Sequence, residues 1–437
     1  MKRIWLTCLT LAIMLGATKA QDNVYPAPPA KAPILIKGGT VHVGNGTVLE
    51  NADVLVEKGK IVQVGTNIQA PAGATVVAAN GKKVYPGLIL PASTLGLQEI
   101  SGVRGSNDFN EIGEINPSVR SIVAYNAESK IINTLRTNGI LLAHVAPQGS
   151  FVGGQSSVVQ LDAWTWEDAA YSMDMGMHIY MPSLLSRPTG RFAALCAAMM
   201  PAPTDPTKQA LDKLEALKQF FRDAKSYFAQ TGKKETNLKL EAARPLFEKK
   251  QKLYLHANQV KQMLLAVDFA KEFGFDVVIV GGSESWQIAQ LLKENNVGVI
   301  LSQMHNLPTL DDDHIDQPYK TPAMLQKAGV LFCINDDDPQ NRGRNMPFNA
   351  GTAAAYGLTK EEALTAITLS AAKLLGIDQK TGSIEVGKDA NIVISQGDIL
   401  DMRSSVITDA FIQGRKIEIN DKHIQLFERY KHRFQVK

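Results

Sequence analysis

Apolar and polar residues alternate in short runs near the N-terminus, and glycine-containing turns separate these runs. Alternation with a period of two between such turns predicts a small antiparallel sheet. The expected turns lie at Gly38-Gly39, Lys58-Gly59 and Asn80-Gly81. The runs themselves are Ile34–Ile36, Thr40–Val43, Val54–Val56, Ile61–Val64, Val76-Val77 and Val84.

The C-terminal part has the same pattern. GSIEVGKDANIVISQGD at 382–398 and VITDAFIQGRKI at 406–417 each predict a strand, a turn and a strand. We therefore expect a composite β-sandwich built from residues 33–85 and 382–420. Residues 421–437 are expected to form a C-terminal tail.

Between these ends, apolar strands alternate with helical patterns. Helices are expected around 260–270, 286–293 and 323–327, and from Thr359 to Leu375, where Thr359 and Glu362 form a capping box. Such alternation predicts a parallel sheet covered by helices, and the strand count favours a (β/α)8 barrel of the TIM type over 86–381. The strands are expected near Leu88 and at Ile140–Val145, Leu253–Leu255, Val277–Val280, Val297–Leu301 and Val330–Ile334.

Residues 186–250 interrupt this alternation and are interpreted as a helical elaboration of the barrel. One apolar stripe with basic residues opposite predicts a packed helix with a solvated face. The stripe consists of Ala210, Leu211, Leu214, Leu217, Phe221 and Ala224.

Residues 1–20 have the charged start, apolar centre and small-residue end of a secretory signal peptide, and the Pro-rich residues 21–32 are typical of a linker. We expect export to the periplasm and no membrane span, because the apolar run is shorter than the ~20 residues that a span needs. The net charge of +3 resides entirely in the signal, through Lys2, Arg3 and Lys19. The neutral remainder argues against a general nucleic-acid or anionic-membrane surface.

Two cysteines follow the signal, Cys196 and Cys333. Cys333 lies in an apolar run and is expected to be a buried thiol. In an oxidising compartment, a disulfide between these two cysteines is the alternative to free thiols.

In a barrel of this kind, function resides at the carboxyl ends of the strands. The residues expected there are His256, Gly281-Gly282, Ser302 and Asp336. Imidazole and carboxylate both offer lone pairs, so His256 and Asp336 are candidate metal ligands.

The stretch VYPGLILPASTLGL at 84–97 resembles the first barrel strand of the amidohydrolase superfamily, in which a similar strand leads into Asp-x-His-x-His. Here Leu90 stands in place of the Asp, and Ala92 and Thr94 replace the two metal-binding His. The GKDAN run resembles the superfamily's β-sandwich. GGSESWQIAQLL and PFNAGTAAAYGLTKEEALTAITLSAAKLLGI are similar to the imidazolonepropionase-like branch.

The resemblance implies one divalent metal, zinc or similar, unless the altered site binds none. His256 matches the fifth-strand ligand, and Asp336 matches the eighth-strand ligand that accepts the proton of the attacking water. Asp337 and Asp338 fit this register less well. Gly281 or Gly282 replaces the sixth-strand His, and no fourth-strand Lys is found.

Other roles stay open for each candidate. His256 could be a hydrogen-bonded remnant, and Asp336 could cap a loop or pair with Arg342 or Arg344. A third metal ligand would have to come from His144 or His305. His144 could equally be structural, and His305 could bind substrate or face solvent.

Two further segments could contact a substrate. Ser283 and Glu284 follow two glycines at a strand-to-helix turn, which could hold an anion or serve as a helix cap. FVGGQSS at 151–157 is expected to be a Gly-rich loop that could reach a substrate carboxylate, and it lacks a phosphate-loop Lys.

Two functions follow. The first is a metal-dependent hydrolase of non-peptide C–N bonds, acting on a small amide or lactam through an atypical site. The second is a catalytically silent barrel that binds a small molecule or assembles with an active relative, as a homo- or hetero-oligomer. The missing pair at Ala92 and Thr94 favours the second, whereas His256 and Asp336 favour the first.

Overall fold

The structure is a computed structural model that describes residues 24–182, 184, 206–230, 235–302, 304–308, 312–336 and 342–435. The expected signal peptide, Cys196, Asp337 and Asp338 lie outside the described residues. No helix in the described part of the chain is both long and apolar enough to cross a membrane.

Strands from both ends of the chain share one eight-stranded sheet, in the order β16-β15-β14-β5-β1-β2-β3, with β4 paired to β1. The two ends meet where β14 pairs antiparallel with β5. This confirms that both ends contribute to one β domain, while its two-layer form stays a prediction. The strands are β1 Ile34–His42, β2 Val48–Glu57, β3 Lys60–Gly65, β4 Thr75–Ala78, β5 Lys83–Pro86, β14 Ile392–Ser395, β15 Ile407–Ile412 and β16 Arg415–Ile417.

The turn at Lys58-Gly59 joins β2 to β3, with φ of 48° and 79° at these two residues. The predicted turn at Gly38-Gly39 is wrong, because β1 continues through it with shifts in its pairing to β2. A Cβ on Gly39 would lie 2.7 Å from Val84, so the glycines instead form an irregularity that lets β1 pass close to β5.

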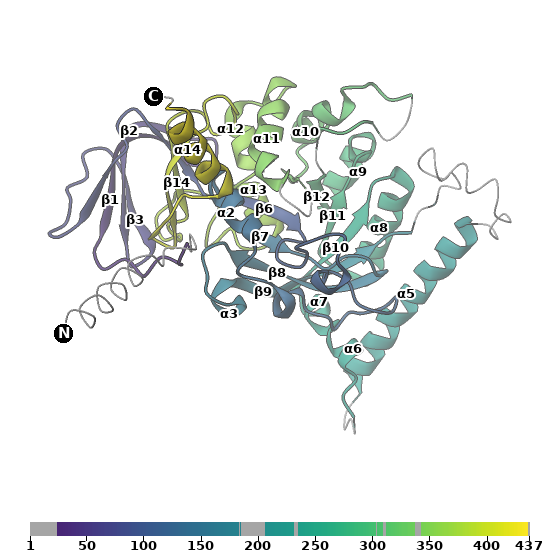
Figure 1. Ribbon diagram of the computed structural model, residues 1–437. Coiled ribbons are helices and arrows are strands. Elements are labelled where there is room, and N and C mark those ends of the chain that lie inside the picture. The colour runs from purple at the N-terminus through teal and green to yellow at the C-terminus, as the bar shows by residue number, and fades with distance from the viewer. Residues whose placement is uncertain are drawn as a thin grey trace, which may run out of the picture.

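The second sheet curls into a nearly closed barrel with the order β13-β12-β11-β10-β9-β8-β7-β6 (Figure 1). All its strands share one direction except β8, which runs antiparallel to β7 and β9. The expected all-parallel barrel is therefore wrong at one strand. The strands are β6 Leu88–Ser93, β7 Ile140–Val145, β8 Val152–Gln160, β9 Ala170–Tyr180, β10 Lys252–Ala257, β11 Val277–Gly281, β12 Gly298–Leu301 and β13 Phe332–Ile334.

FVGGQSS is not the predicted loop but forms the start of β8, whose residues are all buried. Buried main-chain groups need partners, and the two neighbouring strands supply them. One cluster of buried side chains takes a residue from each of seven barrel strands: Ile89, Leu142, Val158, Tyr254, Val278, Ile300 and Cys333. Cys333 is thus a buried free thiol, as expected.

Helices lie outside the barrel sheet (Figure 1). Thr359 and Glu362 form the predicted capping box, but α12 ends at Ala366 and a separate α13 follows. In α5 the predicted stripe is buried apart from Leu211, which is 48% exposed. The helices are α2 Lys130–Arg136, α3 Trp166–Ala169, α5 Pro206–Ala229, α6 Leu238–Glu241, α7 Arg244–Phe247, α8 Val260–Phe273, α9 Ala289–Glu294, α10 Gln317–Ala328, α11 Met346–Ala355, α12 Lys360–Ala366, α13 Leu369–Leu374 and α14 Lys422–Phe434. Short 3-10 helices are η1 Arg104–Ser106, η2 Ser121–Ala124, η3 Ser285–Ile288 and η4 Arg342–Asn345.

Candidate functional site

An irregularity in β6 shapes the carboxyl end of the barrel. The pairing of β6 with β7 shifts between Leu90 and Ser93, where Pro91 lacks an N–H group. The Pro91 oxygen is therefore free to lie 2.8 Å from Nδ1 of His144, the buried histidine on β7.

The main chain of Ala92 finds its partner across the barrel. The amide of Asn335, directly after β13, donates to the Ala92 oxygen at 2.9 Å and accepts from the Ala92 N–H at 3.3 Å. These two side-chain hydrogen bonds link β6 and β13, which are the two end strands in the order of the barrel sheet.

A line of hydrogen bonds runs from Pro91 through three histidines. His144 Nε2 lies 2.7 Å from Ser156 Oγ, and Ser156 Oγ lies 2.8 Å from His178 Nε2. His178 Nδ1 then lies 2.9 Å from Nε2 of His256. We call this line from His144 to His256 the histidine relay.

The protons of the relay have one consistent arrangement when the histidines are neutral. A carbonyl oxygen only accepts, so His144 donates to Pro91 from Nδ1 and accepts from Ser156 at Nε2. Ser156 must then accept from His178 Nε2, and His178 Nδ1 accepts from His256. This leaves Nδ1 of His256 with a free lone pair.

The surroundings keep the relay uncharged near neutral pH. Burial lowers the pKa of His144 to about 4, against the opposing effect of the Pro91 carbonyl. Burial, followed by the charge of His144, lowers the pKa of His256 to about 3. Burial also holds the pKa of His178 well below its usual value, with smaller effects from the two other histidines.

His256 faces a cavity of about 320 Å³ at the carboxyl ends of the strands. The Tyr180 ring stacks on His256 at 3.9 Å between centroids, and its hydroxyl donates to the Pro147 oxygen at 2.8 Å. Burial raises the pKa of Tyr180. The lining residues are Ala92, Ser93, Ala146, Gln148, Tyr180, Met181, His256, Ala257, Asn258, Gln262, Val280, Gly281 and Ser302.

Comparisons with known proteins match this architecture. The Amidohydrolase family profile matches residues 289–417. The crystal structure of an amidohydrolase from Thermotoga maritima is 28% identical, covers 88% of this chain and 99% of its own, and superposes with a TM-score of 0.75. This chain belongs to the amidohydrolase superfamily.

Curated relatives of this amidohydrolase-superfamily protein include imidazolonepropionases. The one from Picrophilus torridus is 29% identical over 43% of this chain and 47% of its own length. The one from Deinococcus radiodurans is 25% identical over 81% of this chain and 88% of its own length. "Amidohydrolase tasK" of Hapsidospora irregularis is 22% identical over 88% of this chain and 43% of its own length. The chain thus spans less than half the length of the first and third of these.

The superfamily implies a metal, but the donor groups do not fit one. In the described part of the chain, no three His, Cys, Asp or Glu side chains converge to hold an ion. Both ring nitrogens of His144 are engaged in hydrogen bonds, and Nε2 of His256 donates to His178. Ala92 and Thr94, which the resemblance aligns with the first-strand ligands, are both buried and offer neither imidazole nor carboxylate. We therefore derive no step through a metal.

Among the other sequence candidates, Gly281 and Ser302 line this cavity, whereas Asp336, His305 and Gly282 do not. Asp336 is buried, and its Oδ2 accepts from Nδ2 of Asn349 at 3.2 Å. His305 is exposed, with Nε2 2.8 Å from the Thr352 hydroxyl. Gly282 turns the chain after β11 with a φ of 60°, and a Cβ there would lie 2.7 Å from Val299.

The turn after these glycines contacts the N-terminus of a different helix, α8. Ser283 donates to Oδ1 of Asn258 at 3.0 Å and lines a neighbouring cavity together with Gly281. The Glu284 carboxylate accepts from the N–H of Val260 at 2.8 Å, where α8 begins. A carboxylate at a helix N-terminus is favourable, so Glu284 stabilises the start of α8. Its side chain forms no capping hydrogen bond to η3, the helix that follows it.

Sequence reasoning missed His178 and Ser156. His178 lies in the apolar run MGMHIYM at 175–181, two residues before β9 ends, and is thus near a strand end as His256 is. The superfamily pattern has a lysine on this strand, so it gives no signal for His178. Ser156 lies in FVGGQSS, whose glycines predict a loop.

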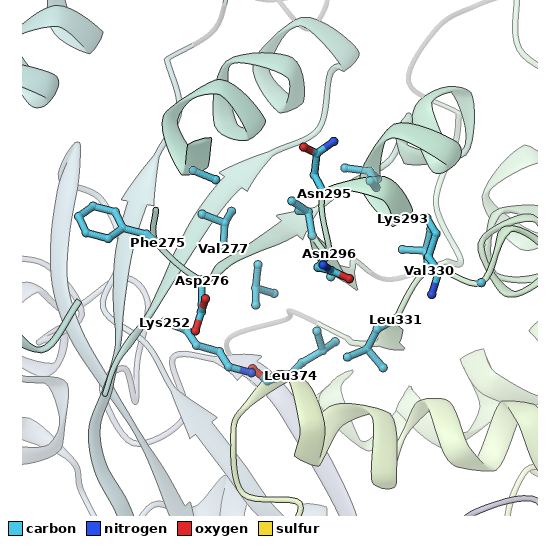
Figure 2. A pocket seen from close by; sticks show the side chains of 16 residues that line it. Lys252, Phe275, Asp276, Val277, Lys293, Asn295, Asn296, Val330, Leu331 and Leu374 are labelled. Carbon is cyan, nitrogen blue, oxygen red and sulfur yellow. The ribbon is translucent and has the colours of Figure 1, made fainter. Parts of the chain in front are cut away.

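A second cavity, of about 460 Å³, lies at the amino ends of β10 to β13 (Figure 2). Its Lys252 donates to the main-chain oxygens of Lys373 and Leu374 at the end of α13. Cations at a helix C-terminus stabilise it, so Lys252 has a structural role. Because barrels place their chemistry at the other end, we assign no reaction to this cavity.

Proposed function

We propose that this protein hydrolyses a non-peptide C–N bond in a small, uncharged cyclic amide such as a lactam, with His256 as proton acceptor. The observation that carries the proposal is the position of His256, which joins the wall of the carboxyl-end cavity to the histidine relay. Among the described lining residues, His256 and Tyr180 alone can ionise, and the pKa of Tyr180 is raised.

In the proposed reaction, Nδ1 of His256 takes a proton from water as the water oxygen bonds to the amide carbon. His256 passes its Nε2 proton to His178, His178 passes one to Ser156, and Ser156 passes one to His144. The charge comes to rest on His144, whose Nδ1–H donates to the Pro91 oxygen. Return along the same path protonates the nitrogen as the C–N bond breaks.

The lining supports an uncharged substrate. Gln148, Asn258 and Ser302 offer amide and hydroxyl groups that suit a carbonyl and an N–H. No Lys, Arg, Asp or Glu belongs to the described lining, so a carboxylate on the substrate would have no partner of opposite charge there.

A second function is favoured by the low pKa of His256 itself. A base with a pKa of about 3 drives proton transfer weakly at neutral pH. Under this alternative the barrel binds a neutral small molecule without turnover, alone or beside an active relative. Export to the periplasm and oligomer formation are likewise proposals.

The test is a screen of small lactams and cyclic imides against the chain purified without a metal-binding tag. The proposal expects slow turnover that survives a chelator and falls about 10²- to 10⁴-fold in His256→Gln. Turnover that requires stoichiometric zinc or manganese would overturn the metal-free mechanism. Binding by calorimetry without any turnover would select the silent barrel.

A further inference from the structure

The C-terminal residues expected to be a tail form the helix α14, which lies on the outer surface near α2 (Figure 1). No residue of α14 is buried. Its N-terminus is fixed by Asp421, which accepts from Ile424 N–H and from the Thr137 hydroxyl, each at 2.8 Å. His423 lies 2.9 Å from Nη1 of Arg344. The helix is therefore docked at its start while its outer side faces solvent.

Three aromatic residues share one side of α14. Phe427, Tyr430 and Phe434 are 63%, 51% and 66% exposed, and their spacing of three and four residues places them on one helix face. The rings of Tyr430 and Phe434 stack with centroids 6.3 Å apart. We call these three residues the aromatic face. Contiguous exposed apolar surface of this kind marks an interaction site.

The same helix is rich in basic residues. α14 contains Lys422, Arg429, Lys431 and Arg433 but a single acid, Glu428. None of the four basic side chains forms an ion pair with another described residue, although Arg433 lies over the Phe434 ring at 5.6 Å. Since the chain beyond residues 1–20 is neutral overall, this helix concentrates positive charge locally.

We propose that α14 lies flat in the interface of an anionic phospholipid bilayer. The aromatic face would enter the boundary between headgroups and acyl chains, and the arginines and lysines would pair with lipid phosphates. A second copy of the chain fits less well. A symmetric contact through this face would bring the basic side chains of both helices together, with one acid on each helix to offset them.

The experiment is sedimentation of the full chain with vesicles of equal parts phosphatidylglycerol and phosphatidylcholine, beside pure phosphatidylcholine. We expect binding to the anionic vesicles alone, weakened by added salt because charge attraction is screened. Arg429→Gln with Arg433→Gln should weaken partitioning about 10- to 30-fold. Phe427→Ser with Phe434→Ser should weaken it at unchanged charge.

Ile112→Ser is the matched control, because Ile112 is 85% exposed and lies far from α14 in the sequence. It should leave partitioning unchanged. Equal binding by all variants, or none at low salt, would overturn the proposal. A wild-type dimer in sedimentation velocity that dissociates in Phe427→Ser with Phe434→Ser would assign the face to a second copy instead.

Discussion

The side-chain amide of Asn335 makes both hydrogen bonds to the main chain of Ala92, as a neighbouring strand residue would. Ala92 occupies the position of a metal-binding histidine in the superfamily pattern. The main chain at this position thus bonds the two edge strands of the barrel to each other, while Ala92 lines the cavity. Asn335 is itself buried, and its own N–H donates to the Leu301 oxygen on β12.

Asn335→Ala should destabilise the fold by about 2–3 kcal/mol, because it leaves the N–H and oxygen of Ala92 buried without partners. Urea unfolding followed by circular dichroism measures this loss. Asn335→Asp keeps an acceptor for the Ala92 N–H but presents an oxygen to the Ala92 carbonyl, so it should be no milder. A cost below about 0.5 kcal/mol in both variants would show that the contact does not close the barrel.

Stability should fall as pH drops from about 6.5 toward 4. His144 and His256 have folded-state pKa values of about 4 and 3, below the unfolded value near 6.5, so the unfolded chain binds more protons in this window. Each of these histidines then lowers the unfolding free energy by about 1.4 kcal/mol for each unit by which the pH falls. Denaturant unfolding at several pH values measures the slope. His144→Gln should reduce it, whereas an unchanged slope would contradict the buried neutral relay.

A buried ion pair joins the barrel to the β domain. Asp162 accepts from Arg136 at 2.5 Å and from Arg415 on β16 at 2.9 Å, and from the Ala27 N–H at 2.8 Å. Asp162→Asn should cost about 3–5 kcal/mol, because it leaves two guanidinium groups without their countercharge. Differential scanning calorimetry measures the loss.

The exposed pair between Glu114 and Lys213 supplies the comparison for this change. Glu114→Gln should alter the unfolding free energy by less than about 1 kcal/mol, since water solvates both groups. If Asp162→Asn and Glu114→Gln lower the unfolding free energy equally, the contacts of Asp162 do not hold the barrel and the β domain together.

Substrate charge provides a separate check on the cavity. Of two lactams that differ by one carboxylate, the uncharged one should have the higher kcat/KM or the tighter binding, because the described lining holds no cation. A preference for the carboxylate would show that another part of the chain supplies the positive charge.

Some of this arrangement could be predicted from the sequence. His256 follows an apolar strand, and the rule for barrel strands places it correctly at the cavity. The shared β domain could be predicted because hairpins such as Lys58-Gly59 carry their geometry in the turn residues themselves. Asp336 resembles a ligand in the sequence, but no three metal-binding groups converge in the described residues.

The reversed strand β8 could not be predicted in the same way. Its glycines and serines are typical of a loop, and its burial on both faces removes the alternation that identifies a strand. Only its pairing with β7 and β9 makes it one. The relay was missed with it, because Ser156 lies on β8 and links the two histidines of the neighbouring strands.

The reversal of β8 also affects how the relay assembles during folding. β7, β8 and β9 follow one another along the chain and pair as a meander, so His144, Ser156 and His178 meet through contacts that are short in sequence. His256 arrives from β10, beyond the long stretch that follows β9. We therefore expect His144, Ser156 and His178 to come together before His256 joins them from β10.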